Sequence, residues 1–212
     1  MKIFSFPFLW LLLTVSMSTV VFNSYGQSEQ GVTINGVKWA TRNVANSGVF
    51  AASPEDAGMF YQWNRNVAWA STGCVTNWDC SVPDGGIIWR KAENPCPEGW
   101  RVPSQDDMQK LFCSCKVSNE WTTEKDVNGC KFIDKATGNS IFLPAAGFRL
   151  SDGALNYAGS IGYYWSNLHG GWDGAYSMSI RNDYYGYCKD GCNAGGYYNL
   201  RTLGLTIRCV AE

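Results

Sequence analysis

Cysteine is the residue of this chain whose type and spacing offer the most chemistry. The sequence holds nine cysteines, and Cys188 and Cys192 lie close enough for their thiols to act together in redox catalysis. In exported proteins such a short-loop pair is more often a structural disulfide, and the same interpretation applies to Cys74 and Cys80. Because nine is an odd number, the connectivity stays open and one thiol is left over. Three cysteines are candidates for that free thiol: Cys113, Cys115 and Cys130.

His169 is the only histidine of the chain, which excludes a multi-histidine zinc site and makes any histidine-assisted catalysis depend on this residue. Gly170 and Gly171 follow it and indicate a loop, where a surface role is more usual than that of a general base. Four aspartates near glycines could bind Ca²⁺, although Asp-Gly is first of all a turn signal. They are Asp152, Asp173, Asp183 and Asp190. We predict no metal site, no required cofactor and no enzymatic activity, with Ca²⁺ binding as an alternative.

Aromatic side chains gather towards the end of the chain, interleaved with Asn, Asp, Ser and Gly. Aromatic rings supply rigid contact area and small polar residues supply hydrogen bonds, which is the composition of antibody-like binding surfaces. We predict that the aromatic side chains in glycine-rich loops bind a ligand together with their polar neighbours. The predicted binding residues are Trp172, Tyr184, Tyr185, Tyr187, Tyr197, Tyr198, Asn167, His169, Asn182 and Asn193. The alternative is that many of the rings fill the core of a loop-rich domain.

Two short helices are expected ahead of these loops. Ser104 is a typical N-cap, Asp107 three residues later resembles the second half of a capping box, and apolar residues at helical spacing continue to Cys115. An earlier helix is predicted from Pro54, which suits a first helical turn, to Trp63. Residues 64–91, rich in Gly, Asn and Trp without a clear period, indicate a long loop stapled by cysteines.

Several later segments have the alternation or the β-branched content of strands. The predicted strands cover residues 37–44, 140–149, 162–168, 175–181 and 203–210. Two early helices followed by strands and long loops are typical of an α+β single domain, with the helices packed on antiparallel strands.

Residues 1–26 have the features of a signal peptide. Lys2 precedes an apolar run, and Ser24 and Gly26 place small residues at a plausible cleavage site. We predict removal of residues 1–26, a single domain over 27–212, and export to the extracellular space or the outer cell surface; an uncleaved apolar anchor is the alternative. The formal net charge is −1 and no basic block occurs, so we expect no nucleic-acid partner and no membrane insertion of the mature chain.

Six motifs spread over nearly all of residues 27–212 resemble those of one family, the Fibrobacter succinogenes major paralogous domain family of secreted proteins. The motifs are GVKWATRNV at 36–44, GMFYQW at 58–63, NPCPEGWRVPSQDDMQKLF at 94–112, LPAAGFR at 143–149, GYYWS at 162–166 and IRCV at 207–210. The resemblance implies a C-type-lectin-like or formylglycine-generating-enzyme-like fold and no established activity. It also implies a disulfide between Cys96 and Cys209.

The functional prediction is therefore a secreted or surface-exposed adhesion module that recognises a glycan or a surface protein through its C-terminal aromatic loops. Formylglycine-generating enzymes use a cysteine pair with copper, so a copper-dependent thiol oxidoreductase using Cys188 and Cys192 is one alternative, although the pair is spaced by three residues here rather than four. A structural surface or fimbrial-tip subunit is the other. The sequence leaves the oligomeric state open.

Overall fold

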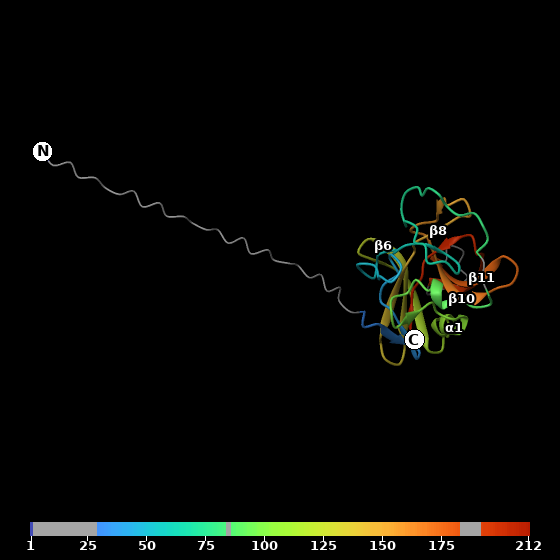
Figure 1. Ribbon diagram of the computed structural model, residues 1–212. Coiled ribbons are helices and arrows are strands. Elements are labelled where there is room, and N and C mark those ends of the chain that lie inside the picture. Colours follow the sequence, from blue (N-terminus) through green and yellow to red (C-terminus); the bar gives the residue numbers. More distant parts are fainter. Residues whose placement is uncertain (2–28, 84–85, 183–191) are drawn as a thin grey trace.

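The protein is mostly β-structure. The structure, a computed structural model, describes Met1 and residues 29–83, 86–182 and 192–212 (Figure 1). In this part of the chain there are fourteen strands, one α-helix and one short 3-10 helix, and the sheets are antiparallel. The predicted α+β, C-type-lectin-like architecture, with two helices packed on strands, is therefore wrong. No helix in the described ranges is long and apolar enough to cross a membrane.

Most elements are short. The strands are β1 Val32–Ile34, β2 Val37–Trp39, β3 Tyr61–Gln62, β4 Trp100–Arg101, β5 Val117–Glu124, β6 Val127–Asp134, β7 Ser140–Pro144, β8 Phe148–Arg149, β9 Leu155–Asn156, β10 Ile161–His169, β11 Gly174–Asn182, β12 Cys192–Leu200, β13 Gly204–Leu205 and β14 Val210–Ala211. The helices are the 3-10 helix η1 Lys91–Glu93 and the α-helix α1 Gln105–Leu111. The four sheets have the strand orders β1-β2-β14-β4, β10-β11-β12, β3-β13-β8-β9 and β5-β6-β7.

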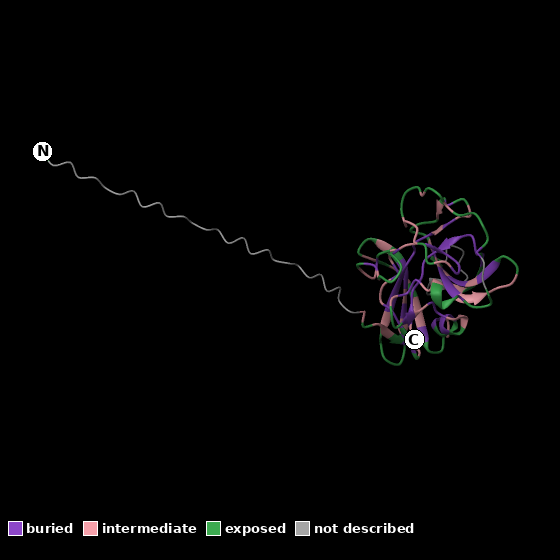
Figure 2. Cartoon of the chain, in the orientation of Figure 1, coloured by how far each residue is buried: buried purple, intermediate pink, exposed green. Residues whose placement is uncertain are grey.

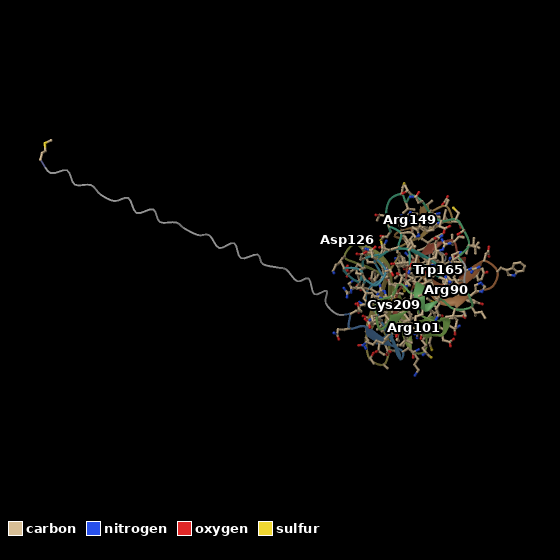
Figure 3. All side chains as sticks on the ribbon, in the orientation of Figure 1. Arg90, Arg101, Asp126, Arg149, Trp165 and Cys209 are labelled. Atoms are coloured by element: carbon tan, nitrogen blue, oxygen red, sulfur yellow. A yellow bond between two sulfur atoms is a disulfide. The ribbon has the colours of Figure 1, made fainter. Side chains whose placement is uncertain are left out.

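The sheet β10-β11-β12 is buried on both faces over much of its area. Tyr164 and Met178 belong to one cluster of buried apolar side chains, which also includes the buried face of α1. Trp165 and Ala175 lie on the same two strands, and their side chains point to the opposite face of the sheet. They belong to a second cluster of buried side chains around Trp63. Figure 2 shows the buried strands at the centre of the body and the exposed loops around it, and Trp165 is labelled within the body in Figure 3.

The prediction of a capped helix after Ser104 is confirmed. The Ser104 hydroxyl accepts a hydrogen bond from the Asp107 backbone N–H, and the Asp107 carboxylate accepts one from the Ser104 N–H, so the capping box is complete. Met108 and Leu111 are buried as predicted. The helix ends at Leu111, however, and Cys115 is exposed rather than part of the buried face.

The helix predicted from Pro54 to Trp63 does not form. Phe60, Tyr61 and Trp63 are all fully buried, and a helix buries one stripe rather than nearly every consecutive side chain. Gly58 has a left-handed backbone conformation (φ +70°), and a Cβ there would lie 2.3 Å from the Val44 carbonyl oxygen. The chain therefore turns at Gly58 and continues into the short strand β3.

Two regions that were not predicted as strands form strands. The hairpin β5-β6 was missed because its turn uses Lys125 and Asp126, both with positive φ, in place of the usual Asn-Gly or Asp-Gly signal. Strand β12 was missed because glycine is unfavourable inside strands, yet Gly195 and Gly196 pair in register with β11. Tyr197 and Tyr198 thus lie on a strand, which corrects their predicted place in a glycine-rich loop.

One of the predicted disulfides is present in the structure and another is not. The predicted disulfide between Cys96 and Cys209 is confirmed. Cys74 and Cys80, in contrast, form no disulfide, and both thiols are exposed. Cys188, and with it the predicted pairing to Cys192, lies outside the described residues, as does the predicted signal peptide apart from Met1.

A buried arginine holds the long loop in place of the expected cysteine staple. The Arg149 guanidinium is fully buried and donates hydrogen bonds to the carbonyl oxygens of Ala70 (2.6 and 2.8 Å), Thr72 (3.0 Å) and Gly73 (3.0 Å). Its remaining terminal nitrogen donates to the Gly153 carbonyl at 2.6 Å. Carbonyl groups that would otherwise lack partners in an irregular loop are thereby satisfied.

Asp134 is expected to make stability sensitive to acid. Its carboxylate accepts hydrogen bonds from the backbone N–H groups of Asn35 (2.7 Å), Ala136 (2.9 Å) and Thr137 (3.0 Å), which hold the pKa of this carboxyl below its ordinary value. The stabilisation is present above the ordinary pKa of about 4 and is lost as pH falls through the lowered pKa of the folded state.

The expected result is that Asp134→Asn lowers the free energy of unfolding at pH 7. Below about pH 4, the free energy of unfolding of this variant should depend less on pH than that of the unaltered protein. Denaturant titrations at a series of pH values measure both effects. Asp126→Asn, at an exposed turn position, serves as the control and should follow the unaltered protein. Identical acid profiles for Asp134→Asn and the unaltered protein would contradict the assignment.

Candidate functional site

Trp172 is the most exposed tryptophan that the structure describes, and it lies at the tip of the turn between β10 and β11. Its exposed fraction is 96 %. Its backbone has a left-handed conformation (φ +46°), which is uncommon for a bulky residue and costs conformational energy. Such strain persists only where the surrounding structure determines the backbone, and it is a reason to look for a function at the site.

Tyr198 fixes the turn from the side of β12. Its hydroxyl donates a hydrogen bond to the Gly171 carbonyl at 2.8 Å. Its ring occupies the space beside Gly170 and Gly174, where added Cβ atoms would lie 2.4 and 2.0 Å from ring atoms. Glycine at these two positions is therefore required for the ring to pack on the turn.

Arg201 and His169 also hold the turn by hydrogen bonds to its backbone. The Arg201 guanidinium donates to the Trp172 carbonyl at 2.9 Å, and the Arg201 backbone N–H donates to the Asp173 carbonyl at 2.8 Å. His169 accepts a hydrogen bond at Nδ1 from the Gly171 N–H at 3.0 Å. Both Arg201 and His169 lie against the ring of the buried Trp63, at 5.8 Å from its centroid. The turn that carries Trp172 is thus pre-organised.

Residues with exposed aliphatic side chains pair through their backbones with the strand ends that flank this turn. Ile87, with an exposed fraction of 73 %, accepts a backbone hydrogen bond from His169 at 2.8 Å, and Ile88 forms an isolated bridge with Leu168. On the other side, Leu200 pairs with Gly174. We call Trp172, Ile87, Ile88 and Leu200 the apolar tip. Large apolar side chains that gather on a surface are typical of interaction sites.

The other predicted binding residues are dispersed. Tyr197 alternates with Tyr198 along β12, so its ring points to the opposite face of the sheet and packs on Tyr163, with centroids 5.5 Å apart. Asn182 is exposed at the far end of β11, and Asn193, on β12, pairs there with Arg181 of β11. Three predicted residues lie outside the described residues: Tyr184, Tyr185 and Tyr187.

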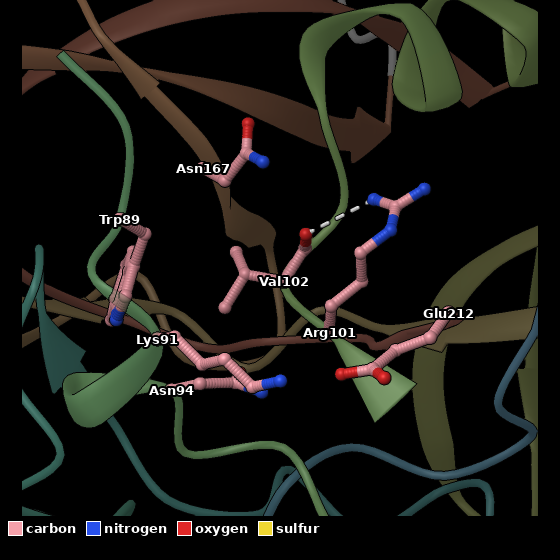
Figure 4. A pocket seen from close by; sticks show the side chains of 7 residues that line it. All are labelled: Trp89, Lys91, Asn94, Arg101, Val102, Asn167 and Glu212. Carbon is pink, nitrogen blue, oxygen red and sulfur yellow. Dashed lines mark hydrogen bonds between the residues drawn. The ribbon is translucent and has the colours of Figure 1, made fainter. Parts of the chain in front are cut away.

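Asn167 lines a separate hollow of about 200 Å³ (Figure 4). Its carbonyl accepts a hydrogen bond from the Trp89 N–H at 2.8 Å. The lining residues carry both signs of charge and are Trp89, Lys91, Asn94, Arg101, Val102, Asn167 and Glu212. Pockets that bind drug-sized ligands usually have volumes of about 300–1,000 Å³. This hollow is therefore smaller than a usual ligand pocket. A wider hollow of about 570 Å³ is lined by Gln105, Tyr176, Gly196, Tyr197 and Tyr198.

The residues considered for metal binding do not form a metal centre in the described part of the chain. No group of three or more His, Cys, Asp or Glu side chains there is placed to hold an ion. The Asp152 carboxylate accepts a hydrogen bond from the Ala154 N–H at 2.9 Å, and Asp173 belongs to the Trp172 turn, so both act as turn residues. Asp183 and Asp190 lie outside the described residues.

Comparison of the chain with protein-family models, with curated proteins and with solved structures gives no match. The resemblance to the Fibrobacter succinogenes major paralogous domain family therefore stays a prediction. The sequence-based prediction included Trp172 and did not include the exposed Ile87 and Ile88. Two adjacent isoleucines in the long loop were the available signal. His169 and Tyr198, which are also among the predicted binding residues, form hydrogen bonds within the turn.

Proposed function

We propose that this chain is an exported recognition module that binds a protein on or outside the cell through the apolar tip. The single observation that carries the proposal is Trp172, almost fully exposed on a turn held by Tyr198, Arg201 and His169. A soluble protein gains nothing for its own fold from a tryptophan in this position. The signal-peptide pattern and the family resemblance support export.

Energetics favour Trp172 as the centre of such an interface. An aromatic side chain of this size buries roughly 150–250 Å² when it enters a partner's pocket, and interface residues that dominate affinity are enriched in tryptophan. Because the backbone of the turn is already held in one conformation, little ordering entropy opposes binding. The surrounding aliphatic side chains can exclude water from the contact.

The composition of the tip favours a protein ligand over a glycan. Sugars stack on aromatic rings and need nearby hydrogen-bonding groups, whereas Ile87, Ile88 and Leu200 offer aliphatic surface. Protein interfaces have apolar centres of this kind and a polar rim. A glycan ligand, which the sequence left open, is the other outcome of a binding screen.

The expected result is that Trp172→Ala weakens binding at least about tenfold, equivalent to about 1.4 kcal/mol, and leaves the unfolding midpoint unchanged. The ligand is sought on arrays of surface proteins and glycans, and affinities are then measured by surface plasmon resonance. Tyr157→Ala, at another exposed aromatic residue on a left-handed backbone, is the matched control.

A second variant separates the two ligand classes. Ile87→Ser should weaken a protein ligand and leave a stacked glycan nearly unaffected. Affinity that is insensitive to both Trp172→Ala and Ile87→Ser would show that the ligand binds elsewhere, and the proposal would then fail.

A further inference from the structure

Cys113 and Cys115 lie in the turn between α1 and β5, and their sulfur atoms are 3.0 Å apart. Non-bonded carbon atoms pack at about 3.5–4.0 Å, so sulfur atoms at this shorter distance interact directly. Cys115 is exposed and Cys113 is partly exposed. Neither thiol is explained by core packing, in contrast to Cys130, which is fully buried. The pair is accessible to a reagent in solution.

The backbone of the turn that carries the two thiols is held by hydrogen bonds that do not involve the sulfur atoms. The Cys113 carbonyl accepts hydrogen bonds from the N–H groups of Lys116 and Val117, each at 2.8 Å. The Lys135 ammonium donates to the Ser114 carbonyl at 2.6 Å, and the Lys135 N–H donates to the Lys116 carbonyl at 2.9 Å. Because these contacts use backbone groups, they do not depend on whether the thiols are reduced or bonded.

The two thiols differ in acidity. The hydrogen bond from the Cys115 thiol lowers the pKa of Cys113, and the backbone N–H groups of Cys115 and Lys116 and the charge of Lys116 act in the same direction. The same hydrogen bond raises the pKa of Cys115, which gives up its proton less readily while it donates to Cys113. Cys113 is therefore the better nucleophile, and Cys115 is placed to resolve a mixed disulfide.

We propose that Cys113 and Cys115 form a thiol–disulfide exchange site for small disulfides, a second activity on a different turn from the apolar tip. In the first step the Cys113 thiolate attacks one sulfur of the disulfide R–S–S–R. The R–S–S–R bond breaks, a Cys113–S–R bond forms, and the first thiolate leaves and takes a proton from water.

In the second step the Cys115 thiolate, its proton released to water, attacks the sulfur of Cys113 and displaces the second thiolate. Two protein thiols are oxidised to one disulfide, and one R–S–S–R is reduced to two R–SH. A disulfide that spans one intervening residue on an exposed turn belongs to the labile class that excess thiol reduces again, which returns the site to its dithiol form.

The test uses the full chain with its accessible thiols reduced under mild conditions, and oxidised glutathione is the probe. Trypsin cleaves after Lys110 and Lys116, so both cysteines fall in the peptide of residues 111–116. The unaltered protein should convert this peptide to the internal disulfide and release two molecules of glutathione. Cys115→Ser should stop at a mixed disulfide on Cys113, and Cys113→Ser should react at least about tenfold more slowly.

The exposed thiols of Cys74 and Cys80 are internal references in the same digest. Reaction of Cys113 no faster than theirs would overturn the proposal, as would equal rates in the Cys113→Ser and Cys115→Ser variants. An internal disulfide that excess reduced glutathione fails to open would overturn it as well, because the bond would then be structural. Circular dichroism of each variant verifies that the fold is retained.

Discussion

Replacing both Cys96 and Cys209 by serine is expected to lower the free energy of unfolding by about 4–5 kcal/mol. The disulfide joins residues 113 positions apart, so in the unfolded chain it closes a loop that includes most of the domain. In the chain-entropy account, the cost of closing such a loop is removed from folding and increases with the logarithm of loop length.

Both cysteines are also buried in the cluster around Trp63, and the Cys209 carbonyl accepts a hydrogen bond from the Ala40 N–H at 2.9 Å. The disulfide therefore links the segment before α1 to the C-terminal segment that leads into β14. Figure 3 labels Cys209 within the body of the molecule. Since small domains are stable by only about 5–15 kcal/mol, the loss would remove a large share of the stability of the protein.

Guanidinium chloride titrations followed by circular dichroism measure this effect. The control is the double variant Cys74→Ser with Cys80→Ser, which changes two exposed thiols and should lie within about 0.5 kcal/mol of the unaltered protein. Equal midpoints for the two double variants would show that the Cys96–Cys209 bond contributes little to stability.

Arg208→Met is expected to lower the free energy of unfolding by about 3–5 kcal/mol. The Arg208 guanidinium is fully buried, and burial lowers its pKa to about 10, so the group is charged at neutral pH. It donates to the Asn43 side-chain oxygen at 2.8 Å and to the carbonyl groups of Ala40 and Thr41. Methionine fills much of the volume and leaves these buried acceptors without a donor.

Arg181→Met is the matched control for Arg208→Met, since Arg181 is exposed on β11, and it should change stability by less than about 0.5 kcal/mol. Thermal and denaturant unfolding of both variants supply the comparison. An unfolding midpoint for Arg208→Met that matches the control would mean that water replaces the guanidinium, and the assigned role would then be withdrawn.

Local signals in the sequence predicted the parts of this fold that local physics determines. The capping box at Ser104 and Asp107 needs only residues three positions apart, and the strands β10 and β11 have continuous β-forming character. Strand β12 could not be predicted in this way, because Gly195 and Gly196 are held extended by pairing with β11 rather than by their own preferences. The helix predicted to Trp63 failed because burial on two sides outweighed helical spacing.

In the candidate site, too, local features could be predicted from the sequence and contacts between distant segments could not. The composition of the C-terminal region predicted an exposed Trp172, since an aromatic side chain beside glycines indicates an exposed turn. The support from Arg201 and the position of Ile87 depend on contacts between segments far apart in the chain. No spacing rule contains that information.

The five hydrogen bonds of Arg149 to loop carbonyl groups have a consequence for the environments in which the protein keeps its shape. An arginine side chain is indifferent to oxidants and reductants, whereas a staple between Cys74 and Cys80 would open in a reducing medium. The contacts that hold Ala70, Thr72 and Gly73 in place are thus independent of the redox state of the surroundings. Among the described residues, the Cys96–Cys209 bond is the disulfide that a reducing medium could open.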